Sequence, residues 1–435
     1  MKNVAIIGLG KSGLSASRYL RKKGVKVWGC DDYATHVQTD DHLQVVKPGQ
    51  LMKLIEQRMF SFMLISPGIR LSHPLVQKAR EYGLEVFCDI EYAFRELEKN
   101  RVPIFGITGT NGKTTTTLLV SFIMNHAGLS AKPVGNIGVP LLDEVEETND
   151  TNFVLELSSF QLQTIHTPLL QAAILLNISP NHLDHHSDFG EYIRAKQHIG
   201  NIVGPDGTLF LQEKAFRAHS WEHTRGHIVR FGFTAACEIF GDGQRIVRFG
   251  VQEEELPKAL QGVFSHDAEN FLAAYALCRH IGISPKQCVD AYSNFRKPPH
   301  RLQLVRTCHG VSFYDDSKAT NIEAVIRAVE SLQANIVLIA GGVHKGYPYY
   351  AWKSAFEGKV KKMFLVGEAA CHMEKDLEGS VPMERCSSFE EAVLGAASMA
   401  KSGDKVVLSP GCSSFDMFSC FEDRGRKFQE LVHQI

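Results

Sequence analysis

The sequence feature that most constrains the fold is a glycine-rich segment between an apolar run and a helical pattern. Residues 104–107 read IFGI, residues 108–116 read TGTNGKTTT, and a helical pattern follows. Backbone N–H groups of such a loop cradle phosphate oxygens, while Lys113 is suited to neutralise terminal phosphates and Thr114 to ligate Mg²⁺. The standard pattern has a glycine five residues before Gly112, where this chain has Ile107. The segment therefore predicts a variant phosphate loop between a strand and a helix.

Apolar runs alternate with helical patterns along the whole chain. At the start, residues 4–7 (VAII) end at glycines, residues 12–23 have helical spacing, and residues 25–28 (VKVW) form the next run. Similar runs stand at residues 62–65, 174–178, 336–339, 363–366 and 406–408. This alternation predicts an α/β fold with parallel sheets. A charged stretch that ends in Pro103 and a Pro-Pro pair at residues 298–299 predict three domains, over residues 1–98, 99–298 and 299–435.

A second glycine motif lies near the start of the chain. Residues 8–13 read GLGKSG, and Asp31 and Asp32 follow the next apolar run. Taken alone, this pattern is typical of a nicotinamide dehydrogenase. The glycines and the helix N-terminus, however, favour any nucleotide diphosphate, and a tight turn without a ligand has the same pattern. The motif therefore predicts a diphosphate site without naming the nucleotide.

Two further segments supply candidate ligands for a metal or a phosphate. Glu156 interrupts the apolar run 153–157 (FVLEL), where a carboxylate is costly unless it is paired or bound to a metal. We interpret it as a metal ligand, with a capping or salt-bridged glutamate as the alternative. Residues 179–186 read SPNHLDHH after an apolar run, but no second ligand group with zinc spacing follows. We take His182 as a metal or phosphate contact and expect His185 and His186 on the surface.

The lysine at position 196 lies in a helical stretch, and its local pattern alone indicates a solvated side chain. Nothing in the neighbouring residues suggests a ligand or a catalytic role.

Composition narrows the function classes. Lys and Arg total 47 against 48 Asp and Glu, a formal net charge of -1, which argues against a dedicated DNA-binding or polybasic membrane protein. No apolar run approaches the length of a membrane span. The ten cysteines show no CxxC pair and are most simply thiols of a reducing cytosol. We therefore expect a cytoplasmic protein that binds neither nucleic acid nor a membrane.

In their joint order, these segments resemble the Mur ligase family, the ATP-dependent amide-forming ligases of bacterial cell-wall precursor synthesis. The resemblance covers essentially the whole chain. It is carried by residues 108–114 (TGTNGKT), 135–138 (GNIG), 156–162 (ELSSFQL), 181–184 (NHLD), 266–270 (HDAEN), 299–301 (PHR), 316–321 (DSKATN) and 409–421.

The resemblance implies a fold, a reaction and its reactants. The fold would combine an N-terminal Rossmann-like UDP-binding domain, a central P-loop ATPase-like domain and a C-terminal Rossmann-like domain. The reaction would add D-glutamate to UDP-N-acetylmuramoyl-L-alanine through an acyl phosphate, with ATP as co-substrate and two Mg²⁺ ions. The implied protein is a bacterial, cytoplasmic monomer.

The resemblance also implies roles for individual residues. Lys113, His182 and Lys196 would be catalytic. Thr114, Glu156, His182 and Lys196 would hold the metal ions, Lys196 after carbamylation, which makes it an anionic oxygen ligand. The implied ATP contacts are Gly109, Thr110, Asn111, Gly112, Lys113, Thr114, Thr115, Asn270, Arg301 and Asp316. The UDP substrate would contact Gly10, Lys11, Ser12, Asp31, Ser66, Gly68 and Asn136. The incoming amino acid would contact Lys318, Thr320, Lys345, Ser414 and Phe421.

One departure from the family concerns the uracil end of the substrate. Members that add D-glutamate often carry a Thr-Arg pair after the aspartate that corresponds to Asp31, and this chain has Asp32 and Tyr33 instead. Tyr33 is able to stack on the base. Three alternatives stay open at this point: a family member that adds another amino acid, a dehydrogenase that uses residues 8–13, and a nucleotide-binding switch without catalysis.

Overall fold

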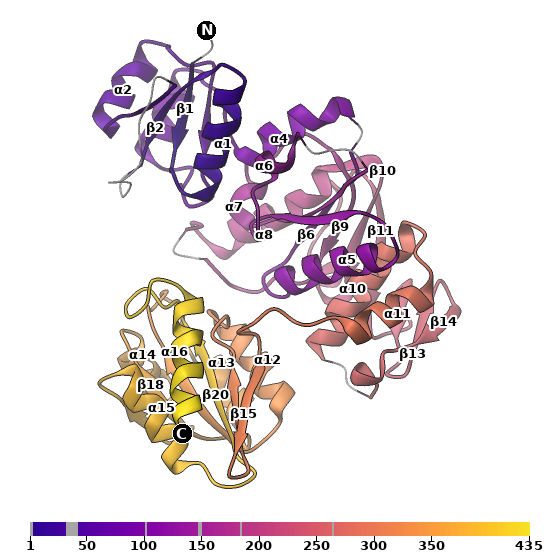
Figure 1. Cartoon of the computed structure of the whole chain (residues 1–435), viewed down its shortest axis with the longest axis vertical. Coiled ribbons are helices and arrows are strands. Elements are labelled where there is room, and N and C mark those ends of the chain that lie inside the picture. The colour runs from indigo at the N-terminus through magenta and orange to yellow at the C-terminus, as the bar shows by residue number, and fades with distance from the viewer. Residues whose placement is uncertain (1–2, 32–41, 101, 147–149, 183–184, 263–264) are drawn as a thin grey trace. The chain divides into compact units, whose positions relative to one another are not determined.

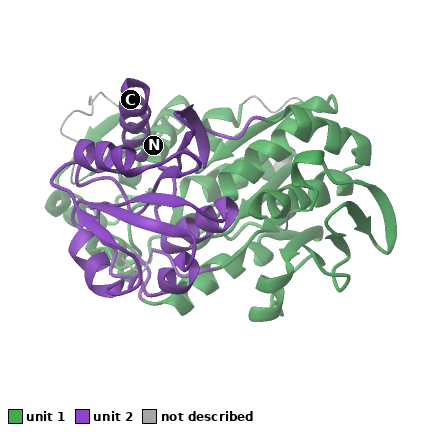
Figure 2. Ribbon diagram, turned by 90° about the horizontal axis from the view of Figure 1, so that it is seen from below, with its two compact units in different colours: residues 1–178, 188–295 green, residues 179–187, 296–435 purple. Residues whose placement is uncertain are grey.

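The computed structural model describes residues 3–31, 42–100, 102–146, 150–182, 185–262 and 265–435. Asp32, Tyr33, Leu183 and Asp184 lie outside the described residues. The chain forms two compact units (Figure 2): one comprises residues 1–178 and 188–295, and the other comprises residues 179–187 and 296–435. The domain boundaries at residues 98/99 and 298/299 stay a prediction.

The first sheet has five parallel strands in the order β3-β2-β1-β4-β5. Its strands β1 and β2 are labelled in Figure 1. Its central strand, β1, is buried over its last four residues, as expected for a parallel strand covered on both faces. The strands are β1 (Asn3–Ile7), β2 (Lys26–Cys30), β3 (Leu43–Val45), β4 (Phe62–Ile65) and β5 (Val86–Cys88). The helices that follow them are α1 (Lys11–Lys22), α2 (Pro48–Glu56), α3 (Pro74–Glu81), α4 (Asp89–Leu97) and the short η1 (Glu98–Asn100).

Glycine allows α1 to approach the end of β1 closely. A Cβ atom on Gly13 would lie 1.9 Å from the carbonyl oxygen of Gly8, while one on Gly10 would meet nothing within 4 Å. We expect Gly13→Ala to lower the free energy of unfolding by about 3 kcal/mol, because backbone rather than a flexible side chain must move. Urea denaturation of Gly13→Ala beside Gly10→Ala tests this. Equal stability of the two variants would contradict it.

The second sheet has nine strands in the order β14-β13-β12-β11-β10-β9-β6-β8-β7, so that β14 and β7 are its edges. Strands β6 to β12 are parallel to their neighbours, and β13 and β14 are antiparallel. The strands are β6 (Ile104–Thr108), β7 (Ala131–Gly135), β8 (Asn152–Glu156), β9 (Leu170–Leu175), β10 (Val203–Gln212), β11 (His227–Gly232), β12 (Ile239–Gly241), β13 (Arg245–Arg248) and β14 (Val251–Glu255).

Two helices, α5 (Lys113–His126) and α10 (His266–His280), lie side by side on this sheet (Figure 1). Their apolar side chains share one core with Phe105, Ile107 and Ile174 of the sheet. The remaining helices of this unit are α6 (Leu141–Glu144), α7 (Ser159–Leu162), α8 (Phe189–Gln197), η2 (His198–Asn201), α9 (Glu213–Ala218), η3 (Lys258–Leu260) and α11 (Pro285–Asn294).

The third sheet has six strands in the order β15-β16-β20-β17-β18-β19, and only the β15–β16 pair is antiparallel. Along β17, Ile336 and Leu338 face one core, while Val337 and Ile339 face another, so helices cover both faces of the sheet. The strands are β15 (Gln303–Cys308), β16 (Val311–Asp315), β17 (Ile336–Gly341), β18 (Val360–Val366), β19 (Met383–Arg385) and β20 (Lys405–Gly411). The helices are α12 (Ile322–Leu332), α13 (Ala351–Phe356), α14 (Ala370–Asp376), α15 (Phe389–Met399) and α16 (Phe421–Gln434).

The three sheets confirm the predicted α/β class with mainly parallel strands. Among the described residues, no helix has the length and apolar character that crossing a bilayer requires.

Candidate active site

The predicted phosphate loop joins β6 to α5. Its two glycines, Gly109 and Gly112, have φ angles of 152° and 86°, which side chains rarely tolerate. A Cβ on Gly112 would lie 2.4 Å from Oδ1 of Asn270, so the loop packs against this buried residue of α10. The strand, loop and helix thus follow one another as the sequence predicts, and Asn270 lies beside the loop from a position about 160 residues further along the chain.

Asn177, which follows β9, fixes the shape of the phosphate loop. Its carbonyl oxygen accepts the Thr110 N–H at 2.9 Å, and its side chain exchanges two hydrogen bonds with the backbone of Asn111. The sequence predicted a strand over residues 174–178, but β9 ends at Leu175, because Asn177 pairs with the loop instead of with a neighbouring strand. Lys113 Nζ donates to the carbonyl oxygens of Gly109 and Thr110 at 2.9 and 2.8 Å.

Lys196 lies beneath this loop and is only 1% exposed. Its Nζ donates to Thr108 Oγ1 at 2.9 Å and lies 5.5 Å from the ring centre of Tyr192, which is one turn earlier on α8. The local prediction of a solvated lysine is therefore wrong, because Tyr192, Ala195 and Lys196 form the buried face of α8. Burial, together with the nearby charge of Lys113, lowers the pKa of Lys196 well below that of an ordinary lysine.

Glu156 ends β8 beside the phosphate-loop strand, in register with Ile107, and is 2% exposed. Its Oε1 accepts a hydrogen bond from Asn136 Nδ2 at 2.8 Å. Its Oε2 is buried and makes no hydrogen bond within the described part of the chain. A buried carboxylate oxygen without a partner is costly, and it is the donor type that Mg²⁺ prefers. Glu156 therefore fits a metal ligand, although no group of three or more His, Cys, Asp or Glu side chains among the described residues is placed to hold a metal ion.

His182 belongs to the short segment 179–187, which forms part of the second compact unit. It adopts a left-handed φ of 56°, and its N–H donates to Oδ1 of Asn181. The His182 carbonyl oxygen accepts the N–H groups of His185 and His186. His186 is 2% exposed, so the prediction that it lies on the surface is wrong, and His185 is half-buried.

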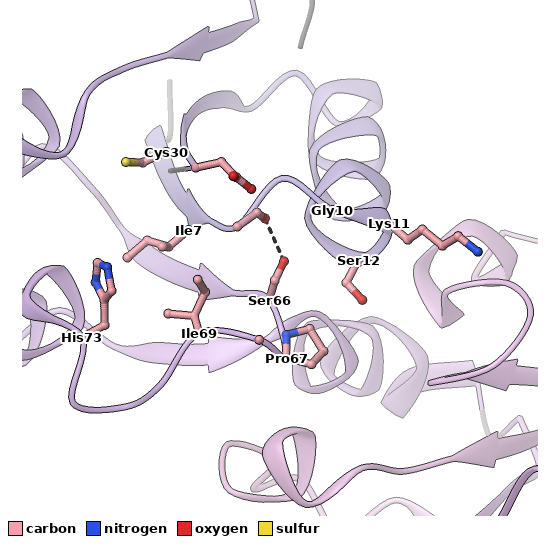
Figure 3. A pocket seen from close by; sticks show the side chains of 12 residues that line it. Ile7, Gly10, Lys11, Ser12, Cys30, Ser66, Pro67, Ile69 and His73 are labelled. Carbon is pink, nitrogen blue, oxygen red and sulfur yellow. Dashed lines mark hydrogen bonds between the residues drawn. The ribbon is translucent and has the colours of Figure 1, made fainter. Parts of the chain in front are cut away.

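The first glycine motif forms one wall of a cavity of roughly 430 Å³ (Figure 3). Its twelve lining residues are Ile7, Gly8, Gly10, Lys11, Ser12, Cys30, Asp31, Ser66, Pro67, Gly68, Ile69 and His73. The set includes six of the seven residues predicted for the UDP substrate; the seventh, Asn136, bonds Glu156 instead.

Two hydrogen bonds set the shape of this cavity. Asp31 Oδ2 accepts the N–H of Leu9 at 2.5 Å. Ser66 Oγ donates to the Gly8 carbonyl at 2.7 Å, the bond that is dashed in Figure 3. His73, which was not predicted from the sequence, also lines the cavity, and its Nδ1 accepts the N–H of Leu75 at the start of α3. A histidine directly before a helix-starting Pro74 was the available signal.

In the second unit, Asp316 follows β16 and is 9% exposed. Its two oxygens accept hydrogen bonds from Ser409 Oγ at 2.8 Å and from the Leu302 N–H at 3.0 Å. Burial raises its pKa to about 7. Its neighbour Asp315, which was not predicted from the sequence, contacts His300 Nδ1 through Oδ2 at 2.7 Å.

The residues predicted for the amino acid lie beyond the carboxyl ends of the parallel strands β16, β17 and β20. Lys318 Nζ lies 3.8 Å from the ring centre of Phe421, and Lys345 Nζ donates to the Thr320 carbonyl at 3.1 Å. Ser414 is 2% exposed and follows Ser413, whose carbonyl accepts the Val343 N–H. Strand ends of this kind are where parallel sheets place their binding sites.

Three family models match successive parts of the chain. "Mur ligase MurD-like, N-terminal domain" matches residues 2–88, "Mur ligase middle domain" matches residues 107–278, and "Mur ligase, glutamate ligase domain" matches residues 300–412.

Full-length relatives and solved structures agree with these matches. The chain is similar to the UDP-N-acetylmuramoylalanine–D-glutamate ligases of Protochlamydia amoebophila (42% identity over 99% of this chain and 98% of the relative) and Acidobacterium capsulatum (36% identity over 99% and 96%). Among solved structures, it is similar in fold to the MurF ligase of Thermotoga maritima in complex with ADP, with a TM-score of 0.63, 15% identity and coverage of 100% of this chain and 95% of the other.

Proposed function

The chain belongs to the Mur ligase family, and from that premise we propose that it joins D-glutamate to UDP-N-acetylmuramoyl-L-alanine at the expense of ATP, in peptidoglycan precursor synthesis. The curated relatives, which match almost the whole length of the chain, are named for this reaction. A dehydrogenase would leave the phosphate loop without a role, and a switch would not need the residues gathered beyond β16, β17 and β20.

The chemistry explains why the reaction needs ATP. A carboxylate does not react with an amine at neutral pH, because oxide is a poor leaving group. Transfer of the terminal phosphoryl group of ATP to the substrate carboxylate gives an acyl phosphate. The amine of D-glutamate then attacks the carbonyl carbon, and phosphate leaves from the tetrahedral intermediate. Because anionic groups must approach one another, electrostatic stabilisation is expected to be the largest catalytic contribution.

The residues of the phosphate loop are suited to the first of these steps. The N–H groups of residues 109–115 would hold the ATP phosphates, and Lys113 would exchange its two bonds to loop carbonyls for phosphate oxygens. Asn270 would contact ATP from α10, next to Gly112. In the second unit, Arg301 and Asp316 would contact the rest of ATP, and Asp316 is suited to the ribose hydroxyls.

The proposal includes two Mg²⁺ ions and the residues that would bind them. Thr114, Glu156, His182 and a carbamylated Lys196 would hold two Mg²⁺ ions, with the unpaired Oε2 of Glu156 as the strongest support. When bound, Mg²⁺ would neutralise phosphate charge during phosphoryl transfer. Lys196 is buried beside the loop, where a neutral amine can react with CO₂ to give a carbamate and a proton.

The remaining proposals concern the sites for the UDP substrate and D-glutamate, the oligomeric state of the protein and its location in the cell. The cavity of Figure 3 would receive the UDP part of the substrate, with Gly10, Lys11 and Ser12 at its diphosphate. Lys318, Thr320, Lys345, Ser414 and Phe421 would hold D-glutamate. We also propose a monomer in the bacterial cytoplasm; the ten cysteines are free thiols, seven of them buried, which suits a reducing compartment.

The main support for the proposal is the phosphate loop, which has the buried residues Glu156 and Lys196 beside it. The chain also matches relatives named for this reaction over almost its whole length. Phosphate release from ATP, with Mg²⁺ and UDP-N-acetylmuramoyl-L-alanine present, is the test. We expect release to require D-glutamate and the nucleotide product to gain the mass of one glutamate residue. L-glutamate and meso-diaminopimelate serve as controls. Release that only meso-diaminopimelate supports would overturn the specificity, and release with no amino acid would overturn the ligase reaction.

A further inference from the structure

A histidine lines the nucleotide cavity and has no role in the reaction described above. His73 stands directly before α3, is half-buried, and is one of the twelve residues around the cavity. Figure 3 shows its imidazole at one end of the cavity, on the side of Ile7 and Cys30, whereas Lys11 and Ser12 stand at the other end. The two ends therefore offer different chemistry to a ligand.

The start of α3 fixes the ring of His73 and its tautomer. Pro74 has no N–H, so the first N–H group that needs a partner at this end of the helix is that of Leu75. His73 Nδ1 accepts this N–H at 3.2 Å. A neutral imidazole that accepts at Nδ1 carries its hydrogen on Nε2. Within the described residues, this Nε2–H makes no hydrogen bond, so it is available to a ligand.

A helix cap alone does not require an imidazole. Ser158, Ser265, Ser284 and Ser388 also accept a backbone N–H, and they cap α7, α10, α11 and α15 with a hydroxyl group. Serine and asparagine are favoured residues at such positions. The imidazole of His73 keeps the cap and adds an N–H group on the far side of the ring, which serine would not provide.

The shape of a uridine diphosphate brings its base to the His73 end of the cavity. The phosphates would lie at Gly10, Lys11 and Ser12, as proposed above, and the base forms the opposite end of the nucleotide. On the uracil ring, O4 is the oxygen farthest from the ribose, and N3–H is next to it. Asp31 is suited to accept the N3–H, but an ionised carboxylate has no hydrogen to offer O4. The Nε2–H of His73 is a donor of the kind that O4 needs.

We propose that His73 is a specificity-determining residue for the nucleotide: its Nε2–H donates to O4 of uracil and thereby selects uridine over cytidine nucleotides. This inference rests on the proposed function, since it takes the UDP part of the substrate as the ligand of the cavity. Cytosine carries an amino group in place of O4. Two N–H groups would then face each other without an acceptor, which makes the binding of a cytidine nucleotide less favourable.

The test is the affinity of the native protein for UDP and for CDP, measured by isothermal titration calorimetry without ATP. Losing one hydrogen bond and leaving its donor unpaired changes an affinity by about tenfold. We therefore expect the Kd for CDP to exceed the Kd for UDP about tenfold. Saturation with UDP-N-acetylmuramoyl-L-alanine should abolish the binding of UDP, because the two share one cavity. UDP binding that persists under saturation would place the nucleotide elsewhere and overturn the inference.

Two substitutions separate the cavity role of His73 from its role as a cap. The amide of His73→Asn reaches the position of Nδ1, so this variant keeps the cap and loses the Nε2–H. Its melting temperature should be close to native, its Kd for UDP about tenfold higher, and its preference over CDP lost. The longer His73→Gln places an amide N–H near the position of Nε2, so it should melt lower but bind UDP almost as the native protein does.

Ser284→Ala is the matched control. It removes the cap of α11, which does not line the cavity, so it should lower the melting temperature and leave both nucleotide affinities unchanged. Equal affinities of the native protein for UDP and CDP would contradict the inference. A His73→Asn variant with the native preference would do the same, because His73 would then be a helix cap only. Failure of the proposed function would look different: the native protein would bind ATP, but neither UDP nor UDP-N-acetylmuramoyl-L-alanine.

Discussion

Replacing Lys113 with methionine is expected to lower kcat/KM about 10³-fold, because a positive charge that stabilises developing phosphate charge is typically worth 10²–10³ in rate. Lys113 is the first residue of α5, and its ammonium group lies among the backbone atoms of the phosphate loop. Methionine keeps the length of the side chain and removes the charge, so the fold of the loop should persist.

The matched control is Lys132→Met, in the same compact unit. Lys132 forms a partly exposed ion pair with Glu144, and ion pairs near the surface contribute little to stability. Phosphate release in the presence of all three substrates should be lost in Lys113→Met and retained in Lys132→Met. Comparable activity of the two variants would show that Lys113 does not act on ATP.

Removing the side chain of Lys196 is expected to reduce activity about 10- to 10²-fold, the loss that is typical when groups supporting a metal site are removed. If Lys196 acts as a carbamate, Lys196→Ala should recover part of its activity when a small carboxylate such as acetate is added. Arg194→Ala, on the exposed face of the same helix, should remain active without it.

A second readout tests the modification directly. Protein equilibrated with isotope-labelled bicarbonate should show the carbon signal of a carbamate in NMR spectra, and the signal should be missing from Lys196→Ala. An unmodified lysine in fully active protein would refute the carbamate while leaving the amine as a possible phosphate contact.

Much of the fold could be predicted from the sequence, because strands and helices leave patterns within short segments of the chain. Apolar runs such as residues 336–339 and 363–366 became central strands, and the loop at residues 108–116 connects a strand to a helix as predicted. The end of β9 could not be predicted, because Asn177 leaves the sheet and forms hydrogen bonds with a loop that lies about 65 residues earlier in the chain.

The candidate site could be predicted only in part, because the burial of a side chain depends on segments that are distant in the sequence. Lys196 has the local pattern of a solvated residue, yet α8 presses it against Thr108. His186 is similar: its position in a polar cluster predicts exposure, whereas the structure buries it.

The two edges of the nine-stranded sheet bear on how the chain avoids aggregation. At one edge, β14 ends in the acidic run Glu253 to Glu255, and a second strand carrying the same charges would be repelled. At the other edge, β7 contains Lys132 and Pro133, and proline has no N–H to offer an incoming strand. Each edge thus discourages strand-to-strand pairing between copies, which helps an enzyme with so wide a sheet to remain dispersed at high concentration.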